Sequence, residues 1–542
     1  MFSPSSLVGL LFNRVKSHVV ATNFQVAGQK VVSRDPATNE ALREFDCASE
    51  QAVLEVVGRA KRAQPGWAKL GVKKRVSVLR NFQRLLQENK AEVAELISRE
   101  TGKPYVEALT TEIIVVLDSV RFLAENAFAL LGDERLPHGN IAMKTKSGRI
   151  LREPHGVIGI ISPWNYPFSI PATESLSALA AGNAVVLKPS EFTTLVALKL
   201  AELFHSAGVP EEAFHVVAGD GSTGEALMKS GLDKLLFTGS VATGKRIAQA
   251  AATRLLPIVL ELGGKDPMIV LEDADIDVAS SGALWGAFVN AGQTCLSVER
   301  CYVDRKIYQP FLEACSLKTK QLRVGKGMDS EADIGPMIHE RQLRVVEQHV
   351  ENARRLGARI LTGGKRLPEL GPNFYAPTVI ADVTHDMQIM REETFGPVLP
   401  IMAFDSEDEA VRLANDSEYG LSASIWTKDR RRGEALVPRI NAGIVMVNDA
   451  VSCFGISEAP HGGVKSSGIG RAHGRFGLEE MVRIKYVASD RLPDMKKIWW
   501  YRYGEGFTRQ MEDMLDLQFA SRITQRIQGV FGSARNFFSK RL

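Results

Sequence analysis

The stretch NAGQTCLSVERC, residues 290–301, holds two cysteines six positions apart, and either thiol could be a nucleophile or a packing residue. Cys295 follows the small residues of AGQT, which leave room for a substrate. Cys301 lies in the strand-like run ERCYVDR, where it alternates like a core residue. Because a free thiol is mostly protonated near neutral pH, a catalytic cysteine needs help from amides, a base or a cofactor's charge. On these residues alone, packing in the core explains either cysteine, and Cys301 has the weaker case for catalysis.

Glu261 is a candidate base. It lies in LELGGK, inside an apolar, strand-like run that ends at two glycines. A carboxylate in such a run is costly to bury unless it is used or paired, and burial raises its pKa toward the range useful for a general base. An ion pair with Lys265 is the alternative that the sequence leaves open.

Two glycine-rich loops could bind a dinucleotide. GDGSTG, residues 219–224 with Gly221 inside it, spells GxGxxG after an apolar run. It lacks the acid that should follow about twenty residues later to bind a ribose. FTGSVATGK also follows a strand-like run, and it would place Gly239 and Ser240 at the start of a helix. Amides and the helix dipole favour a pyrophosphate there.

A third segment, VVLKPSE, would place Lys188 and Glu191 at the carboxyl end of a strand, where open α/β sheets bind ligands. A carboxylate at that place can accept hydrogen bonds from both hydroxyls of an adenosine ribose and would repel a 2'-phosphate. The pattern therefore favours NAD over NADP, although a solvated surface pair is the ordinary explanation of such charges.

The composition excludes several classes of protein. With 542 residues, 45% of them apolar, the chain is long enough for three or four structural units. The net charge of +4 is small, and the body of the chain has no basic block interleaved with aromatics, so no nucleic-acid partner is expected. Five scattered cysteines without a CxxC pair argue against a disulfide framework, predict no metal site and indicate a reducing compartment.

The two ends differ from the body. No run reaches the roughly 18 apolar residues of a membrane span, and the first 34 residues are basic without acids. We expect a cytoplasmic location, with a mitochondrial transit peptide as a weakly supported alternative. The tail beyond Arg491 is basic and aromatic and spaces Ile523, Ile527 and Phe531 at helical intervals. It predicts a helix docked on protein or, as the alternative, a peripheral helix on an acidic membrane.

The hydrophobic pattern predicts an α/β protein. Residues 51–131 have helical periodicity. From Gly156, short apolar runs alternate with helical segments in βαβ-sized units, which predicts a doubly wound parallel sheet. A second alternating block, with IVLEL, PMIVL and GIVMVN, extends from residue 257 to about residue 447.

Together these segments resemble the aldehyde dehydrogenase superfamily over roughly residues 35–487. Eight motifs occur in the family's order: DPATNE (35–40), SPWNYP (162–167), KPSE (188–191), FTGS (237–240), ELGGK (261–265), GQTC (292–295), EETFGP (392–397) and GGVKSSGIGR (462–471). The resemblance implies an α/β fold with a Rossmann-like cofactor domain, an α/β catalytic domain and a β-flap oligomerisation segment. The implied boundaries are 1–34 for an N-terminal segment, 35–135 and 155–260 for the NAD-binding domain, 261–447 for the catalytic domain, 136–154 and 448–490 for the flap, and 491–542 for an amphipathic extension.

The resemblance also implies a role for each matching residue. Cys295 would form a thiohemiacetal and then a thioester, Asn165 would join the Cys295 amide in an oxyanion hole, and Glu261 would activate the hydrolytic water. The expected cofactor is NAD, with NADP as the alternative, and the expected assembly is a homodimer or homotetramer. The cofactor contacts would be Ser162, Trp164, Lys188, Glu191, Gly221, Gly239, Ser240, Glu393 and Phe395.

Four features depart from the family's pattern. Ala472 stands where many members have a Glu, His461 where a Phe is common and Glu174 where many have a Lys, and the fourth departure is the C-terminal extension. They bear on the substrate and on water delivery more than on the reaction type. An acyl-transferring dehydrogenase, a thiol esterase and an inactive structural homologue remain alternatives. Phe168, Ile170, Phe454 and the aromatic tail favour an apolar or aromatic aldehyde over a charged one, although core packing explains the same residues.

Overall fold

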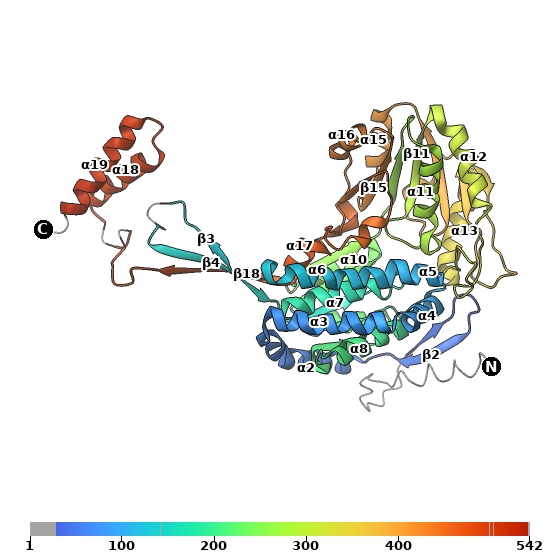
Figure 1. Cartoon of the computed structure of the whole chain (residues 1–542), viewed down its shortest axis with the longest axis horizontal. Helices are drawn as coiled ribbons and strands as arrows, with labels where there is room; N and C mark the ends of the chain where they lie inside the picture. Colours follow the sequence, from blue (N-terminus) through green and yellow to red (C-terminus); the bar gives the residue numbers. More distant parts are fainter. Residues whose placement is uncertain (1–28, 141–142, 498, 502, 540–542) are drawn as a thin grey trace. The chain divides into compact units, whose positions relative to one another are not determined.

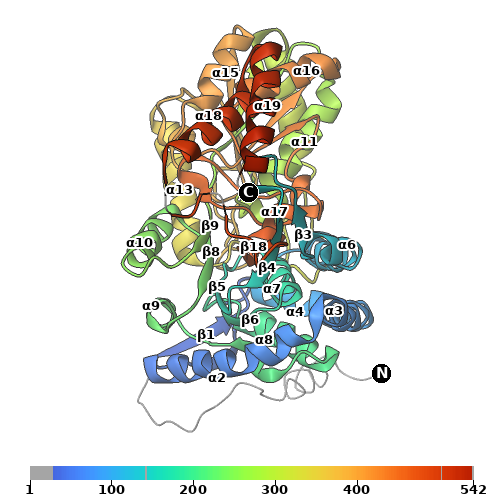
Figure 2. The same ribbon diagram turned by 90° about the vertical axis from the view of Figure 1, so that its left-hand side faces the viewer.

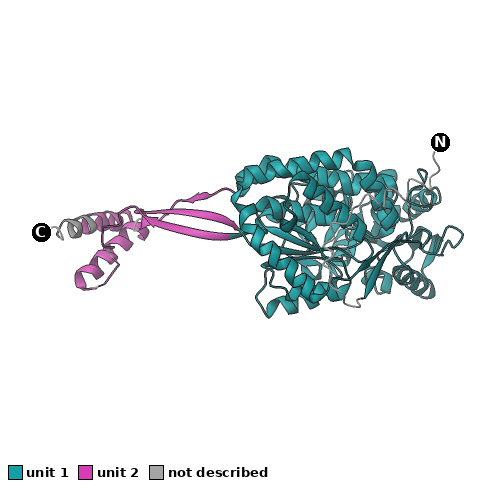
Figure 3. Ribbon diagram, turned by 90° about the horizontal axis from the view of Figure 1, so that it is seen from below, with its two compact units in different colours: residues 1–131, 154–483 teal, residues 132–153, 484–542 magenta. Residues whose placement is uncertain are grey.

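The structure, a computed structural model, describes residues 29–140, 143–497, 499–501 and 503–539 (Figure 1). It divides into two compact units, one of residues 1–131 and 154–483 and one of residues 132–153 and 484–542 (Figure 3). Residues 1–28, which hold most of the segment behind the transit-peptide alternative, lie outside the described residues. The predicted cytoplasmic location stays a prediction.

The first sheet of unit 1 has the strand order β17-β9-β8-β5-β6-β7 and is parallel except for β17. Its strands are rich in Val, Ile and Leu and are largely buried, as a parallel sheet covered on both faces requires. Their bounds are β5 (Val157–Ile161), β6 (Ala184–Lys188), β7 (Phe214–Val216), β8 (Lys234–Gly239), β9 (Ile258–Leu262) and β17 (Gly468–Ile469).

Helices cover both faces of this sheet (Figure 2). One face carries α3 (Gly71–Glu88), α4 (Lys90–Thr101), α6 (Ile114–Leu130), α7 (Ser169–Ala181) and α8 (Thr194–Ala207). The other carries α2 (Glu50–Lys69), α9 (Gly221–Lys229) and α10 (Val241–Ala252). Adjacent strands β5 and β8 therefore lead to helices on opposite faces, which makes their carboxyl ends the topological switch point where such sheets bind ligands.

The second sheet has the order β12-β13-β14-β11-β10-β15-β16, with only the β12–β13 pair antiparallel. Its strands are β10 (Asp266–Val270), β11 (Val298–Asp304), β12 (Arg359–Thr362), β13 (Thr378–Ala381), β14 (Val398–Phe404), β15 (Ser422–Trp426) and β16 (Ile444–Val447). Its helices are α11 (Ile276–Phe288), α12 (Tyr308–Thr319), α13 (Glu340–Arg355), α14 (Gln388–Arg391), α15 (Glu407–Asn415) and α16 (Arg430–Leu436). Besides several short 3-10 helices, unit 1 also contains β1 (Lys30–Arg34), β2 (Ala41–Asp46), α5 (Tyr105–Glu107), a π-helix over Ala108–Ile113 and α17 (Gly474–Glu479).

The predicted parallel α/β architecture is confirmed, with one correction. The run IVLEL, expected to open the second alternating block, is β9 and pairs with β8 in the first sheet. An apolar run of this kind suits either sheet, and the pairing that decides between them joins segments distant in the sequence. Glu261 therefore belongs to the first sheet, whereas Cys295 precedes a strand of the second.

Unit 2 contains a small sheet of β3 (Glu134–Leu136), β4 (Lys146–Pro154) and β18 (Val482–Asp490), whose last two strands begin or end in unit 1. It also contains α18 (Glu505–Phe519) and α19 (Ile523–Ser539). Among the described helices, none is long and apolar enough to cross a bilayer. Of the predicted flap segment 448–490, residues 448–483 lie in unit 1 and 484–490 in unit 2; the predicted domain boundaries remain predictions.

Candidate active site

The loop that presents Cys295 has an unusual backbone. Asn290 and Ala291 are left-handed, with φ of 55° and 54°, and Gly292 follows with φ of 72°. A non-glycine residue in this region costs on the order of 1–3 kcal/mol and persists only where its surroundings enforce it. A Cβ at Gly292 would lie 2.1 Å from the carbonyl oxygen of Gly396, so position 292 admits no side chain.

Hydrogen bonds from distant segments hold this loop. A carboxylate oxygen of Glu107 accepts the Asn290 amide at 3.0 Å. The Asn290 side chain donates to the carbonyls of Asn165, at 2.9 Å, and Gln293, at 3.2 Å. The Gln293 side chain accepts the amide of Ile338 at 2.9 Å. The sequence reading missed Glu107, Asn290 and Gln293, because their role appears only when separate segments meet.

Asn165 lies beside the same loop. Its side-chain nitrogen donates to the carbonyl of Gln293 at 3.0 Å, two residues before Cys295. Its own carbonyl accepts Lys103 Nζ at 2.8 Å, and Lys103 forms a fully buried ion pair with Glu112 at 2.7 Å. The other Glu112 oxygen accepts two amides at the start of α7, at 2.8 and 2.9 Å. One buried ion pair thus ties the Asn165 segment to the helix that follows it.

Glu261 is buried in β9, and neither of its carboxylate oxygens has a hydrogen-bond partner among the described residues. Burial, and secondarily the carboxyl group of Glu174, raise the pKa of Glu261 well above its ordinary value. His461 Nε2 lies 3.9 Å from Glu261 Oε2. The alternative of an ion pair with Lys265 is wrong, because Lys265 pairs with Glu299.

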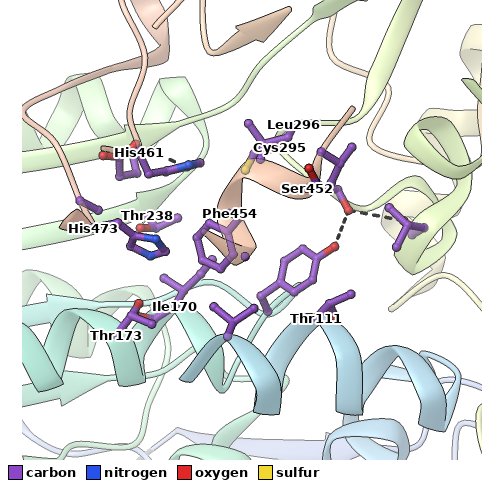
Figure 4. A pocket seen from close by; sticks show the side chains of 18 of the residues that line it. Thr111, Ile170, Thr173, Thr238, Cys295, Leu296, Ser452, Phe454, His461 and His473 are labelled. Carbon is purple, nitrogen blue, oxygen red and sulfur yellow. Dashed lines mark hydrogen bonds and ion pairs between the residues drawn. The ribbon is translucent and has the colours of Figure 1, made fainter. Parts of the chain in front are cut away.

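Cys295 and Glu261 line one cavity of about 220 Å³. Figure 4 shows Cys295 in this cavity, with Phe454 and His461 among the other lining residues. Burial, followed by the carboxyl groups of Asp266, Glu393 and Glu261, raises the pKa of the Cys295 thiol well above its usual value. The other lining residues are Thr110, Thr111, Val115, Tyr166, Ile170, Thr173, Glu174, Thr238, Leu262, Trp285, Val289, Thr294, Leu296, Val451, Ser452, Phe454, Gly455, His461, Ala472 and His473.

Cys301, by contrast, is fully buried in β11, within the core of the second sheet, as predicted. Burial also raises the pKa of its thiol. It does not line the cavity, so the two cysteines have different surroundings. None of the five cysteines forms a disulfide, and the described residues contain no cluster of side chains suited to a metal ion.

The departures Ala472 and His461 face each other across an antiparallel bridge, each donating its amide to the other's carbonyl at 2.8 Å. The His461 ring packs against Phe454, with centroids 5.2 Å apart, and lies 5.8 Å from the His473 ring. Burial lowers the pKa of His461 to about 3 and that of His473 to about 4. Both imidazoles are therefore neutral near pH 7.

Several predicted cofactor residues meet at the carboxyl edge of the first sheet. Ser162 follows β5, and its amide donates to the carbonyl of Lys188, the last residue of β6, at 3.1 Å. The Ser162 hydroxyl is buried without a partner among the described residues. Glu191 is 39% exposed and lies 3.7 Å from Lys188 Nζ. Ser240 caps α10 by accepting the Thr243 amide at 3.4 Å.

Gly239 ends β8, so it lies at the same edge of the sheet. Gly221 begins α9 after the outer strand β7, with Asp220 as the helix cap. The GxGxxG sequence is thus a turn from strand to helix, two strands away from β5.

Glu393 and Phe395 lie near the Cys295 loop. Glu393 accepts the Gly264 amide at 3.1 Å, and a Cβ at Gly264 would lie 2.5 Å from the Cys295 carbonyl oxygen. Burial raises the pKa of Glu393 to about 8. The Phe395 ring meets the Trp164 ring edge to face at 5.4 Å. The glycines of ELGGK therefore let the base, the Cys295 loop and the EETF segment approach one another.

These features fit a nicotinamide dinucleotide. A buried serine hydroxyl without a partner, the capped N-terminus of a twelve-residue helix and a half-exposed carboxylate lie at the switch-point edge of a doubly wound sheet. Trp164, Glu393 and Phe395 continue from this edge toward the Cys295 loop.

Known proteins resemble the chain over most of its length. The model of the aldehyde dehydrogenase family matches residues 24–487. A 4,4'-diapolycopene aldehyde oxidase of Methylomonas sp is 39% identical, over 90% of this chain and 91% of its own length. A mitochondrial succinate-semialdehyde dehydrogenase of Oryza sativa subsp. japonica is 38% identical, over 86% and 87%. The NAD+ complex of an aldehyde dehydrogenase from Bacillus cereus has a TM-score of 0.84 at 34% identity and covers 90% of this chain and 99% of its own. This chain therefore belongs to the aldehyde dehydrogenase family.

Proposed function

We propose that the chain oxidises an aldehyde to a carboxylic acid with NAD, using Cys295 as nucleophile, Asn165 as an oxyanion donor and Glu261 as the base for hydrolysis. The observation that carries this proposal is that Cys295 and the unpartnered Glu261 carboxyl group line one cavity. Asn165 is bonded to the loop that presents the cysteine.

In the first step, Cys295 loses its thiol proton to solvent water, and the thiolate Sγ adds to the aldehyde carbon. The Asn165 side chain uses one amide hydrogen on Gln293, so its second hydrogen can join the Cys295 backbone N–H in stabilising the oxyanion. Such a donor typically contributes about 2.7–4 kcal/mol at a transition state. NAD held by Ser162, Glu191, Ser240 and Glu393 would supply a positive charge that favours the thiolate and an acceptor for the hydride, so that a thioester would remain on Cys295.

In the second step, Glu261 takes a proton from water as the water oxygen attacks the thioester carbonyl. The carbon–sulfur bond breaks, Glu261 returns the proton to Sγ, and the carboxylic acid and the free thiol result. A carboxyl group with a raised pKa is a stronger base once ionised, which suits the removal of a proton from water.

A preference for NAD over NADP is part of the proposal. Glu191 places a carboxylate beside the edge where an adenosine ribose would bind, and a 2'-phosphate there would meet its charge. Comparing kcat/KM for the two cofactors, in the unchanged chain and in Glu191→Gln, tests this preference. Equal use of both cofactors by the unchanged chain would contradict it.

The nucleophile is tested by replacing Cys295 with Ala and measuring NADH production from a panel of aldehydes. We expect loss of activity, with Cys301→Ala as the matched control that retains it. NADH production that required coenzyme A would favour acyl transfer instead. Ester cleavage without any aldehyde oxidation would favour a thiol esterase. If the chain without any substitution showed neither activity, a structural role would be favoured.

We further propose a homodimer or homotetramer that touches membranes through its tail. Residues 491–542 contain ten Lys or Arg and five Asp or Glu, so the tail's net charge of +5 exceeds the +4 of the whole chain. On α18 and α19, Phe519, Ile523 and Phe531 are 65%, 75% and 70% exposed. A basic segment with exposed apolar side chains suits an anionic lipid surface. Vesicle binding by the intact chain tests this proposal.

A further inference from the structure

The lining of the cavity at Cys295, as the described residues form it, has no cationic side chain. Of its 22 lining residues, none is Lys or Arg, and two are the acids Glu174 and Glu261. The walls are mainly aliphatic and aromatic side chains with several threonines (Figure 4). A negatively charged group of a ligand would therefore find no counter-charge in this lining.

The two histidines in the lining do not supply a positive charge. His461 and His473 are buried, pack around Phe454 at centroid distances of 5.2 and 4.6 Å, and are neutral near pH 7 because burial lowers the pKa of each. His461 Nε2 already faces the Glu261 carboxyl group at 3.9 Å. Neither imidazole can pair with a carboxylate as a cation near neutral pH.

The nearby cations are occupied. Arg471 does not line the cavity, and its Nη1 donates to the carbonyls of Gly463, at 3.0 Å, and Gly470, at 2.7 Å. Lys103 is fully buried and bonded to Glu112 and to the Asn165 carbonyl. Moving either cation toward a substrate would leave buried polar groups without their partners, which is costly.

We propose that this site takes aldehydes with a neutral, apolar body and discriminates against semialdehydes that carry a carboxylate. The inference rests on the proposed function and concerns the same cavity. A carboxylate entering this lining would lose its water without gaining an ion pair. The specificity would thus differ from that named for the rice relative, despite 38% identity.

The test compares succinate semialdehyde with its methyl ester, which differs mainly in lacking the charge, in the intact chain with NAD at pH 7.5. Butanal and octanal extend the neutral series. We expect kcat/KM for the ester to exceed that for the acid by on the order of 100-fold, the effect of burying an uncompensated charge. Cys295→Ala serves as the blank that assigns the NADH to this site.

The outcomes separate the two proposals. If the acid and its ester react within about threefold of one another, the specificity inference is wrong and the proposed function stands. If no aldehyde of the set yields NADH above the Cys295→Ala blank, the proposed function fails and the inference falls with it. A large preference for the ester, with good turnover of octanal, supports both.

Discussion

Glu261 gives the site its clearest expected pH dependence. Because burial and Glu174 raise its pKa, Glu261 keeps its proton to higher pH than an ordinary carboxyl group, and the base form is lost as pH falls through that raised value. We expect the rate of thioester hydrolysis, measured after a burst of NADH, to rise with pH through this raised pKa.

Glu174→Gln is the matched variant for this dependence, because it removes the neighbouring carboxyl group and keeps a similar shape. The hydrolysis profile should then move to lower pH. If the hydrolysis rate of the chain without substitutions stopped rising at the pH where an ordinary carboxyl group titrates, Glu261 would not be the titrating base.

At the scale of elements, the left-handed loop before Cys295 makes Gly292 sensitive. In Gly292→Ala, the new Cβ would lie 2.1 Å from the Gly396 carbonyl oxygen at a φ of 72°. We expect a lower Tm and a large loss of kcat, measured by thermal unfolding and NADH production.

Gly66→Ala is its control, because Gly66 lies exposed within α2 and a Cβ there meets nothing within 4 Å. Alanine should preserve activity and stabilise that helix by up to about 1 kcal/mol. Equal behaviour of the two variants would contradict the loop's role.

The buried Lys103–Glu112 pair should contribute to the stability of unit 1. Glu112→Ala leaves Lys103 without its counter-charge and removes the acceptor for two amides at the start of α7. We expect the free energy of unfolding to fall by about 3–5 kcal/mol, measured with denaturant. Glu125→Ala, which breaks a surface pair with Arg121, should cost less than about 1 kcal/mol. Similar losses in both would argue against the buried pair's role.

The sequence predicted what local patterns determine. The alternation of apolar runs and helical segments was sufficient for the parallel α/β architecture, and the setting of Cys301 in ERCYVDR was sufficient to assign it to the core. Glu107 could not be found in this way, because its bond to the Asn290 amide joins positions 183 residues apart. The ion pair of Lys265 with Glu299 and the pairing of β9 with β8 could not be predicted either, because each also joins separate segments of the chain.

The backbone conformation of the loop before Cys295 could be predicted only in part from the sequence. Asn and Gly tolerate the left-handed region, but Ala291 between them gives no signal for it. The roles of Cys295, Asn165, Glu261 and the cofactor contacts follow from the resemblance of their motifs to the family, and these roles remain predictions.

At the scale of the whole molecule, we expect the tail to affect location rather than chemistry, because none of the residues that line the cavity at Cys295 comes from residues 491–542. Deleting residues 491–542 should abolish flotation with phosphatidylserine vesicles and leave kcat/KM for octanal unchanged. Raising the salt concentration should release the intact chain, since the attraction is partly electrostatic.

Zwitterionic vesicles are the control and should bind the intact chain more weakly. If deletion instead changes the mass of the assembly by light scattering and leaves vesicle binding as it was, the tail packs against protein and the membrane proposal is wrong.

The most direct test of the central claim is a single mixing experiment on Glu261→Gln with octanal and NAD. The variant should form the thioester but not hydrolyse it, so we predict a burst of one NADH per active site followed by arrest. Mass spectrometry should then find one octanoyl group on the peptide that contains Cys295. Steady turnover at the rate of the unchanged chain, or an octanoyl group on Cys301, would contradict the account.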